Sequence, residues 1–191
     1  MNYLLQTKYK LIKPFLNWSY NNINSNNNNY INIILSKIPK SFNNYYELFL
    51  GDGQLLLNML LLKKYKKCRI NGKIYAYDNN PYLVRLFRVI KNHKDEFYKY
   101  IKKYKDNYLS IEQFKSIRID NKKRQIPNPT CIKSAKLSKE AYYYWIRKQF
   151  NQIKDNTKTE EDLIKNSAMF LFLNKTCFRG LYRDGPNGFN V

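Results

Sequence analysis

The chain has 191 residues, of which 43% are hydrophobic, and a formal net charge of +21 at pH 7. This length allows one ordinary domain, or a core with a small appended module, and the hydrophobic fraction is typical of a globular protein. The longest apolar run, at residues 55–62, is too short to cross a bilayer, and the N-terminus lacks the apolar core of a signal peptide, so we expect a soluble intracellular protein.

The excess of Lys and Arg favours a polyanionic partner, most simply nucleic acid, because these side chains displace the counterions condensed on phosphates. An AT-rich genome would also enrich the chain in Lys, Asn, Ile and Tyr, so a compositional origin of the charge stays open. The three cysteines, Cys68, Cys131 and Cys177, are far apart and form no C-x-x-C pair. We therefore expect no metal site and no disulfide framework. The single histidine, His93, lies in a charged stretch and is expected at the solvated surface.

The first half of the chain has the pattern of a strand, a helix and a second strand. A polar low-complexity tract at residues 21–32 predicts a loop. The apolar stretch 45–50 predicts a buried strand that ends at the turn Gly51-Asp52-Gly53. The Leu-rich run from Leu55 predicts a crossover helix, and 72–78 predicts the second strand. This βαβ order indicates a parallel sheet.

A helix is predicted directly after the second strand. Asn80 can cap its start, and Pro81 suits the first helical position, where a missing N–H costs nothing. Apolar residues then recur at helical spacing, namely Leu83, Leu86, Phe87 and Ile90. The stretch NNPY at 79–82 is therefore interpreted as a helix start, and not as a catalytic tetrapeptide.

The second half is basic and rich in tyrosine, and we expect it to be mostly helical. A loop is predicted over residues 120–136, where Pro127 and Pro129 disfavour a helix. Thr159 and Asp162 have the spacing of a capping box before an apolar helix. These patterns predict two domains, residues 1–91 and residues 92–191.

Four segments, in this order, resemble Dam-type DNA adenine-N6 methyltransferases. They are KPFLNW (13–18), YELFLGDGQLLLN (46–58), YYWIRKQFN (143–151), and LNKTCFRGLYR (173–183) followed by GFNV (188–191). The similarity covers the chain apart from the Asn-rich tract and an insertion near 110–138. It implies an α/β fold: a partial Rossmann-like methyltransferase fold with a mostly helical target-recognition module.

The resemblance implies S-adenosylmethionine as cofactor and places its site at the end of the first strand. Gly51 and Gly53 would let the backbone approach the methionine part closely, and Asp78 would bind the ribose hydroxyls. Three further residues match cofactor-proximal positions, Trp18, Glu47 and Phe49. The alternatives are a tight turn for the glycines, a helix cap for Asp78, and core packing for Trp18 and Phe49. Asp52, between the glycines, is expected to repel the cofactor carboxylate and weaken binding.

The resemblance also implies double-stranded DNA as the partner. Phe178 falls where the family inserts an aromatic ring into the base stack, and Arg183 falls where it reads a guanine. Arg179 stands where the family has Asn, and Asn174 belongs to the same L-N-[RK] stretch. The alternatives are hairpin packing for Phe178 and a phosphate contact for Arg183.

The family's catalytic Asp-Pro-Pro-Tyr does not occur in the 191 residues, so we identify no catalytic residue here and expect no methylation by this chain alone. A truncated, split or decayed methyltransferase fits this pattern. A non-catalytic DNA-binding protein derived from the family fits it too, as does a subunit completed by a polypeptide that carries Asp-Pro-Pro-Tyr.

Overall fold

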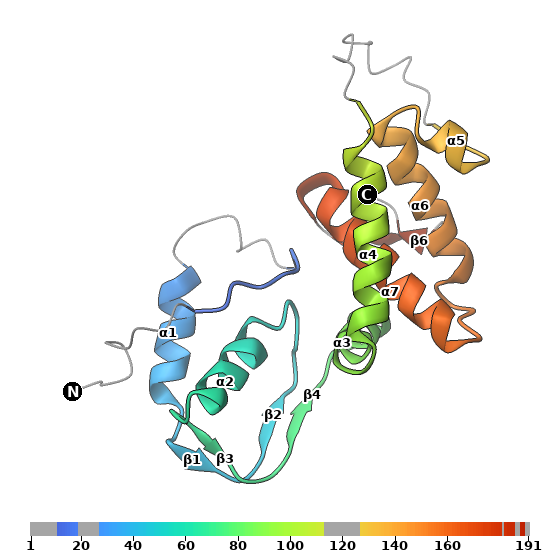
Figure 1. Cartoon of the computed structure of the whole chain (residues 1–191). Helices are drawn as coiled ribbons and strands as arrows, with labels where there is room; N and C mark the ends of the chain where they lie inside the picture. Colours follow the sequence, from blue (N-terminus) through green and yellow to red (C-terminus); the bar gives the residue numbers. More distant parts are fainter. Residues whose placement is uncertain (1–10, 19–26, 113–126, 181, 186–187, 190–191) are drawn as a thin grey trace. The chain divides into compact units, whose positions relative to one another are not determined.

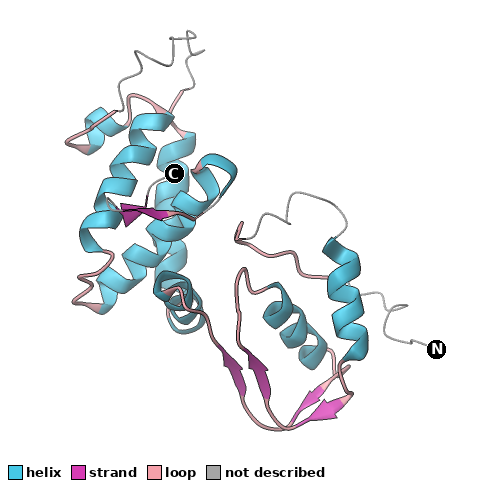
Figure 2. Cartoon of the chain, turned by 180° about the vertical axis from the view of Figure 1, so that it is seen from behind, coloured by secondary structure: helices cyan, strands magenta, loops and turns pink. Residues whose placement is uncertain are grey.

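The computed structural model describes residues 11–18, 27–112, 127–180, 182–185 and 188–189 (Figure 1). The chain divides into two compact units, residues 1–83 and 84–191. The first unit combines helices with short strands, and the second is helical with one small hairpin (Figure 2). The structure is therefore α/β, with a mostly helical second part. No helix within the described residues is long and apolar enough to span a membrane.

The first unit contains a ribbon of two parallel chain segments. Each segment forms two short strands separated by an irregular step. The strands are β1 (Ser41–Phe42), β2 (Tyr45–Glu47), β3 (Arg69–Ile70) and β4 (Ile74–Ala76). β1 pairs in parallel with β3, and β2 with β4. Backbone bonds from the amide of Asn71 to the carbonyl of Phe42, and from that of Tyr45 to Lys73, continue the pairing across the step. The predicted parallel βαβ order is confirmed, but both strands are shorter than the predicted 45–50 and 72–78.

Two helices, α1 (Asn27–Lys37) and α2 (Gln54–Lys64), pack against this ribbon (Figure 1). Ile31 and Leu35 of α1 are buried against Met59 of α2 and Ile70 of β3. The prediction of a loop at 21–32 is therefore wrong for residues 27–32, because burial of one apolar face of α1 outweighs the polar composition. Residues 21–26 lie outside the described part of the chain.

The second unit is built on helices α3 (Pro81–Asn92), α4 (Lys94–Leu109), α6 (Lys139–Ile153) and α7 (Glu160–Thr176). Shorter elements complete it, namely α5 (Ile132–Ala135), the 3₁₀ turn η3 (Phe178–Gly180), β5 (Asp184–Gly185) and β6 (Gly188–Phe189). Aromatic side chains make its core: the Phe172 ring of α7 meets the Tyr108 ring edge-on at 5.5 Å and the Tyr142 ring at 5.7 Å. Large rings bury much apolar area each, which suits a small helical unit.

Helix α3 begins as predicted but belongs mainly to the second unit. The amide of Leu83 donates to Asn80 Oδ1 over 2.9 Å, which confirms Asn80 as the cap. Leu86 and Val89 are buried, and Arg85 donates to the backbone carbonyl of Lys154 over 2.9 Å. The compact units therefore divide near the start of α3, whereas the sequence placed the boundary at its end, between residues 91 and 92.

Local signals in the second half were correct in part. The capping box is confirmed, since Thr159 Oγ1 accepts from the amide of Asp162 and the Asp162 carboxylate accepts from the amide of Thr159. Pro127 and Pro129 lie outside any helix, but α5 at 132–135 forms within the stretch expected as loop.

His93, expected at the solvated surface, is only partly exposed: its Nδ1 lies 3.0 Å from Glu160 Oε1, and its side chain is 29% exposed. The residues 113–126 of the predicted insertion lie outside the described part.

Candidate functional site

The turn after β2 and the residue after β4 meet at one corner of the first unit. The amide of Gly51 donates to Asp78 Oδ2 over 2.9 Å, and the amide of Asn80 donates to Asp78 Oδ1 over 2.9 Å. Gly51 and Gly53 have φ of 53° and 73°, in the left-handed region that suits glycine. Asn80 caps α3. Asp78 instead joins the Gly51 turn to the loop between β4 and α3. The carboxyl ends of parallel strands are where α/β sheets bind ligands.

A pocket of about 470 Å³ opens beside this corner. This volume lies within the range of small-molecule and cofactor sites. Four of the predicted cofactor residues line it, namely Trp18, Glu47, Phe49 and Gly51. Asp52 and Gln54 line it as well, whereas Gly53 and Asp78 are not among the lining residues. Gly53 instead begins α2, and Asp78 supports the Gly51 amide. The structure thus gathers all six predicted cofactor residues in one region, four of them at the pocket wall.

Glu47 is a buried carboxyl group in the pocket wall, with 8% of its surface exposed. The hydroxyl of Tyr45 donates to Glu47 Oε2 over 2.7 Å. Burial raises the pKa of Glu47 from 4.5 to about 7, the nearby Asp52 charge adds to the rise, and the Tyr45 bond opposes it. Burial and the same bond hold the pKa of Tyr45 far above its usual value, so Tyr45 stays a donor. A bound cation would favour the ionised form of Glu47.

Aromatic residues frame the rest of the pocket. A Cβ atom placed on Gly51 would lie 3.5 Å from Trp18 Cδ1, so the indole packs against the glycine turn. Phe49 is 90% exposed although it lines the pocket, which makes core packing the wrong explanation for this residue. An exposed phenyl ring at a pocket rim is available to a ligand.

Asp52 is hydrogen-bonded at the start of α2. Its Oδ1 accepts from the amide of Gln54 over 3.0 Å, at the first turn of α2. The positive end of a helix dipole stabilises a carboxylate at this position. Asp52 still lines the pocket as a carboxylate, so the repulsion of a cofactor carboxylate stays a prediction.

The segment 173–183 contains both buried and exposed residues. Asn174 is fully buried, and its Nδ2 donates to the carbonyl of Gly180 over 2.8 Å, which fixes the turn after α7. Phe178 on this turn is 68% exposed, and Arg183 is exposed as well. The side chain of Arg179 lies outside the described part. Phe178 and Arg183 are therefore placed where a ligand can reach them, whereas Asn174 is placed to support the turn.

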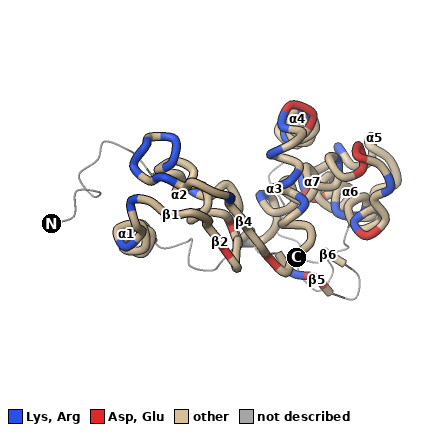
Figure 3. Tube along the Cα trace, turned by 90° about the horizontal axis from the view of Figure 1, so that it is seen from below, with Lys and Arg blue, Asp and Glu red and all other residues tan. Residues whose placement is uncertain are grey.

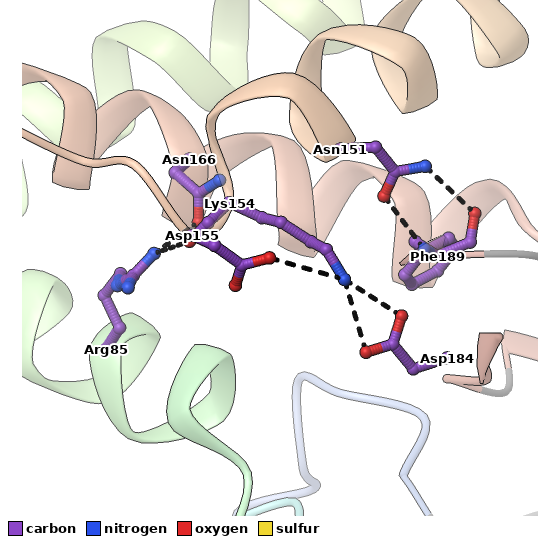
Figure 4. A network of polar contacts seen from close by, with 7 residues as sticks. All are labelled: Arg85, Asn151, Lys154, Asp155, Asn166, Asp184 and Phe189. Atoms are coloured by element: carbon purple, nitrogen blue, oxygen red, sulfur yellow. Dashed lines mark hydrogen bonds and ion pairs between the residues drawn. The ribbon is translucent and has the colours of Figure 1, made fainter. Parts of the chain in front are cut away.

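The hairpin β5–β6 is tied to α6 by side chains to which the sequence alone gave no role (Figure 4). Asn151 Oδ1 accepts from the amide of Phe189 over 2.8 Å, and Arg147 Nε donates to the carbonyl of Phe189 over 2.6 Å. Lys154 Nζ lies 3.0 Å from Asp184 Oδ1. Arg147 and Asn151 are four residues apart and share one helix face. The segment 143–151 resembles the family, so this spacing could have marked Arg147 and Asn151 as functional candidates from the sequence alone.

Lys and Arg residues occur in both units (Figure 3). In the first unit they gather at the end of α2 and in the loop that follows, as Lys63, Lys64, Lys66, Lys67 and Arg69. Several acidic residues lie in the first turns of helices, such as Asp95 and Glu96 of α4 and Glu160–Asp162 of α7. Among the described residues, no group of three or more His, Cys, Asp or Glu side chains could hold a metal ion.

The first unit is thus a parallel βαβ arrangement with a ligand-sized pocket beside the turn at Gly51, and the second unit is mostly helical. The model of the D12 class N6 adenine-specific DNA methyltransferases matches residues 26–191. The chain belongs to this family, and the resemblance found in its sequence is confirmed.

A curated relative gives a more particular comparison. The chain is 28% identical over 186 residues to the Type II methyltransferase M.MjaIII of Methanocaldococcus jannaschii. The match covers 94% of this chain and 51% of the relative. The chain therefore spans about half the length of the curated relative that it matches.

Proposed function

We propose that this chain supplies the S-adenosylmethionine pocket and the DNA-recognition unit of an adenine-N6 DNA methyltransferase. The observation that carries the proposal is the hydrogen bond between the Gly51 amide and the Asp78 carboxylate, beside a pocket of about 470 Å³. That bond supports the proposal because ligands of Rossmann-like folds bind where the carboxyl ends of neighbouring strands converge.

The residues that line the pocket, together with Asp78 beside it, fit the chemical groups of S-adenosylmethionine. Each Asp78 oxygen accepts one backbone amide, and a carboxylate oxygen can accept more than one bond, so the ribose hydroxyls can still donate to it. Glu47 suits the cationic ammonium group, because its raised pKa falls when a positive charge approaches. Trp18 and Phe49 offer apolar surface. When bound, the cofactor supplies an electrophilic methyl group on its sulfonium sulfur.

On the DNA side, Phe178 would fill the gap left by an expelled adenine, and Arg183 would read a guanine. Expelling a base costs a few kcal/mol, and stacking of about 1–3 kcal/mol per base offsets much of this cost. Asn174 would act indirectly by holding the turn that carries Phe178. The 191 residues contain no Asp-Pro-Pro-Tyr to accept the hydrogens of the adenine amino group. Methyl transfer would therefore require a polypeptide region with that motif.

Calorimetry with S-adenosylmethionine tests the cofactor half of the proposal. We expect binding by the wild-type chain and a loss of about tenfold or more in Asp78→Asn, since a hydrogen bond to a charged group contributes about 1.5–3 kcal/mol. Asp106→Asn, which removes a surface carboxylate of α4, is the matched control and should bind normally. Equal affinities of Asp78→Asn and wild type would contradict the proposed site.

A second candidate function is DNA binding without cofactor. It is favoured by the two acidic side chains at the pocket, Glu47 and Asp52, which oppose a ligand carboxylate. Retained affinity for duplex DNA with no heat of S-adenosylmethionine binding would establish it. Transfer of labelled methyl groups to DNA by the purified chain would instead contradict the expectation that it is inactive alone.

A further inference from the structure

The hairpin β5–β6 is held at both of its strands by side chains of α6 and of Lys154, the residue that follows α6 (Figure 4). Lys154 Nζ lies 3.0 and 3.3 Å from the two carboxylate oxygens of Asp184, which begins β5. Asn151 and Arg147 bind the backbone of Phe189, which ends β6. We call Arg147, Asn151, Lys154 and Asp184 the hairpin clamp.

The ion pair of the clamp is largely shielded from water on its cationic side. The Lys154 side chain is only 12% exposed, whereas that of Asp184 is 40% exposed. Lys154 Nζ also lies 3.9 Å from Asp155 Oδ2, so Asp184, at 3.0 Å, is the nearer of these two carboxylates. A shielded ammonium group depends on such partners more than a surface lysine does, because they compensate its desolvation. The carbonyl of Lys154 also accepts from Arg85, so the residue is fixed at its backbone as well.

Arg183 lies between two anchored neighbours. The ring of Tyr182 packs 5.6 Å from that of Phe170 and 5.4 Å from that of Phe189. Asp184, on the other side, is held by Lys154. Arg183 itself is exposed. The structure therefore fixes the backbone on both sides of one exposed guanidinium group.

Fixing the backbone matters for an arginine that reads a base. Bidentate recognition of guanine requires both guanidinium donors to meet two acceptors in one plane, whereas a phosphate contact tolerates many orientations. We propose that Lys154 is a positioning residue. By holding Asp184 it fixes the backbone at the neighbouring Arg183, and in this way it determines how strongly the chain discriminates between DNA sequences. This proposal rests on the proposed DNA-binding function and adds the residues that determine its specificity.

The competing explanation is that Lys154 only attracts phosphates. The two partners of the ion pair separate these explanations, because Lys154→Met lowers the net charge by one and Asp184→Asn raises it by one. If Lys154 only attracts phosphates, Lys154→Met should weaken and Asp184→Asn should strengthen the affinity for every DNA sequence alike. Positioning predicts that both variants lose discrimination, although their nonspecific affinities shift in opposite directions. Lys148→Met, which removes an exposed lysine of the same helix, is the matched control for charge.

The experiment starts from a pool of random-sequence duplexes enriched by the wild-type full chain. For each variant we then measure two affinities, one for an enriched duplex and one for the same duplex with one guanine replaced. The ratio of the first affinity to the second measures discrimination. We expect the ratio to fall about tenfold in Lys154→Met and in Asp184→Asn, as for loss of one bidentate contact, and to stay unchanged in Lys148→Met. The charge-reversed double variant Lys154→Asp with Asp184→Lys should recover part of the ratio.

A measurement without DNA tests the clamp directly. Nitrogen-15 relaxation of the Arg183 amide should show larger fast motion in Asp184→Asn than in wild type, and no change in Lys148→Met. Unchanged discrimination in Asp184→Asn, or an equally rigid Arg183 amide, would overturn the proposal while leaving the proposed function intact. A wild-type chain that enriches no sequence at all would refute the site-specific function itself, and the positioning role with it.

Discussion

Replacing Gly188 by alanine is expected to destabilise the second unit by about 2–5 kcal/mol. Gly188 has a φ of 85°, and an added Cβ would lie 2.5 Å from Asn151 Oδ1 and 2.7 Å from Asn151 Cγ. The backbone conformation alone costs an L-residue about 1–2 kcal/mol. The close contact then forces Asn151 to move.

Moving Asn151 breaks the bond that its Oδ1 accepts from the amide of Phe189. Phe189 is fully buried, so this amide would be left without its partner, which costs about 1–3 kcal/mol. Gly51→Ala is the matched comparison, because Gly51 also has a positive φ but its added Cβ would meet Trp18 at an ordinary 3.5 Å. Only the backbone cost applies there, and the free energy of unfolding should fall by about 1–2 kcal/mol.

Denaturant unfolding followed by tryptophan fluorescence can separate the two units, because the chain has two tryptophans, Trp18 in the first unit and Trp145 in the second. In a Trp18→Phe background, Trp145 alone reports the transition of the second unit. The unfolding free energy of the second unit is compared for Gly188→Ala, and that of the first unit for Gly51→Ala. Equal destabilisation in the two cases would refute the reasoning, because it would mean that the Asn151 contact contributes nothing.

Three further predictions follow from single side chains. The folded protein keeps the Glu47 proton that the unfolded chain loses near pH 4.5, so stabilisation that is fully present below pH 4.5 should be lost as the pH rises to about 7. This loss amounts to at most about 3 kcal/mol, and denaturant titrations at several pH values should show no such contribution in Glu47→Gln. Thr159→Ala removes the cap of α7 and should cost about 1 kcal/mol, measured by chemical denaturation, with Thr157→Ala as the uncapped control. Phe178→Ala should leave stability unchanged because the ring is 68% exposed, but it should reduce the fluorescence increase of 2-aminopurine at a target adenine in duplex DNA.

Signals that act between near neighbours could be read from the sequence. Asn80 and Pro81 start a helix through bonds within three residues, and Thr159 with Asp162 does the same, so these elements need no knowledge of the rest of the chain. The glycine turn after an apolar strand, and the order of strand, helix and strand, likewise follow from local pattern. The family segments added the expectation that the Gly51 turn and Asp78 would lie together, which the structure bears out geometrically.

What only the tertiary structure decided is which side chains face outward and which contacts join distant segments. Residues 27–32 read as a polar loop but form a helix, because the core of the first unit buries Ile31. Asn174 and Phe178 belong to one motif, yet one is fully buried and the other exposed. The bonds from α6 to the hairpin join residues 30 to 42 positions apart. The spacing of Arg147 and Asn151 places them on one helix face, but which residues they contact depends on how whole helices pack, and no local pattern encodes that.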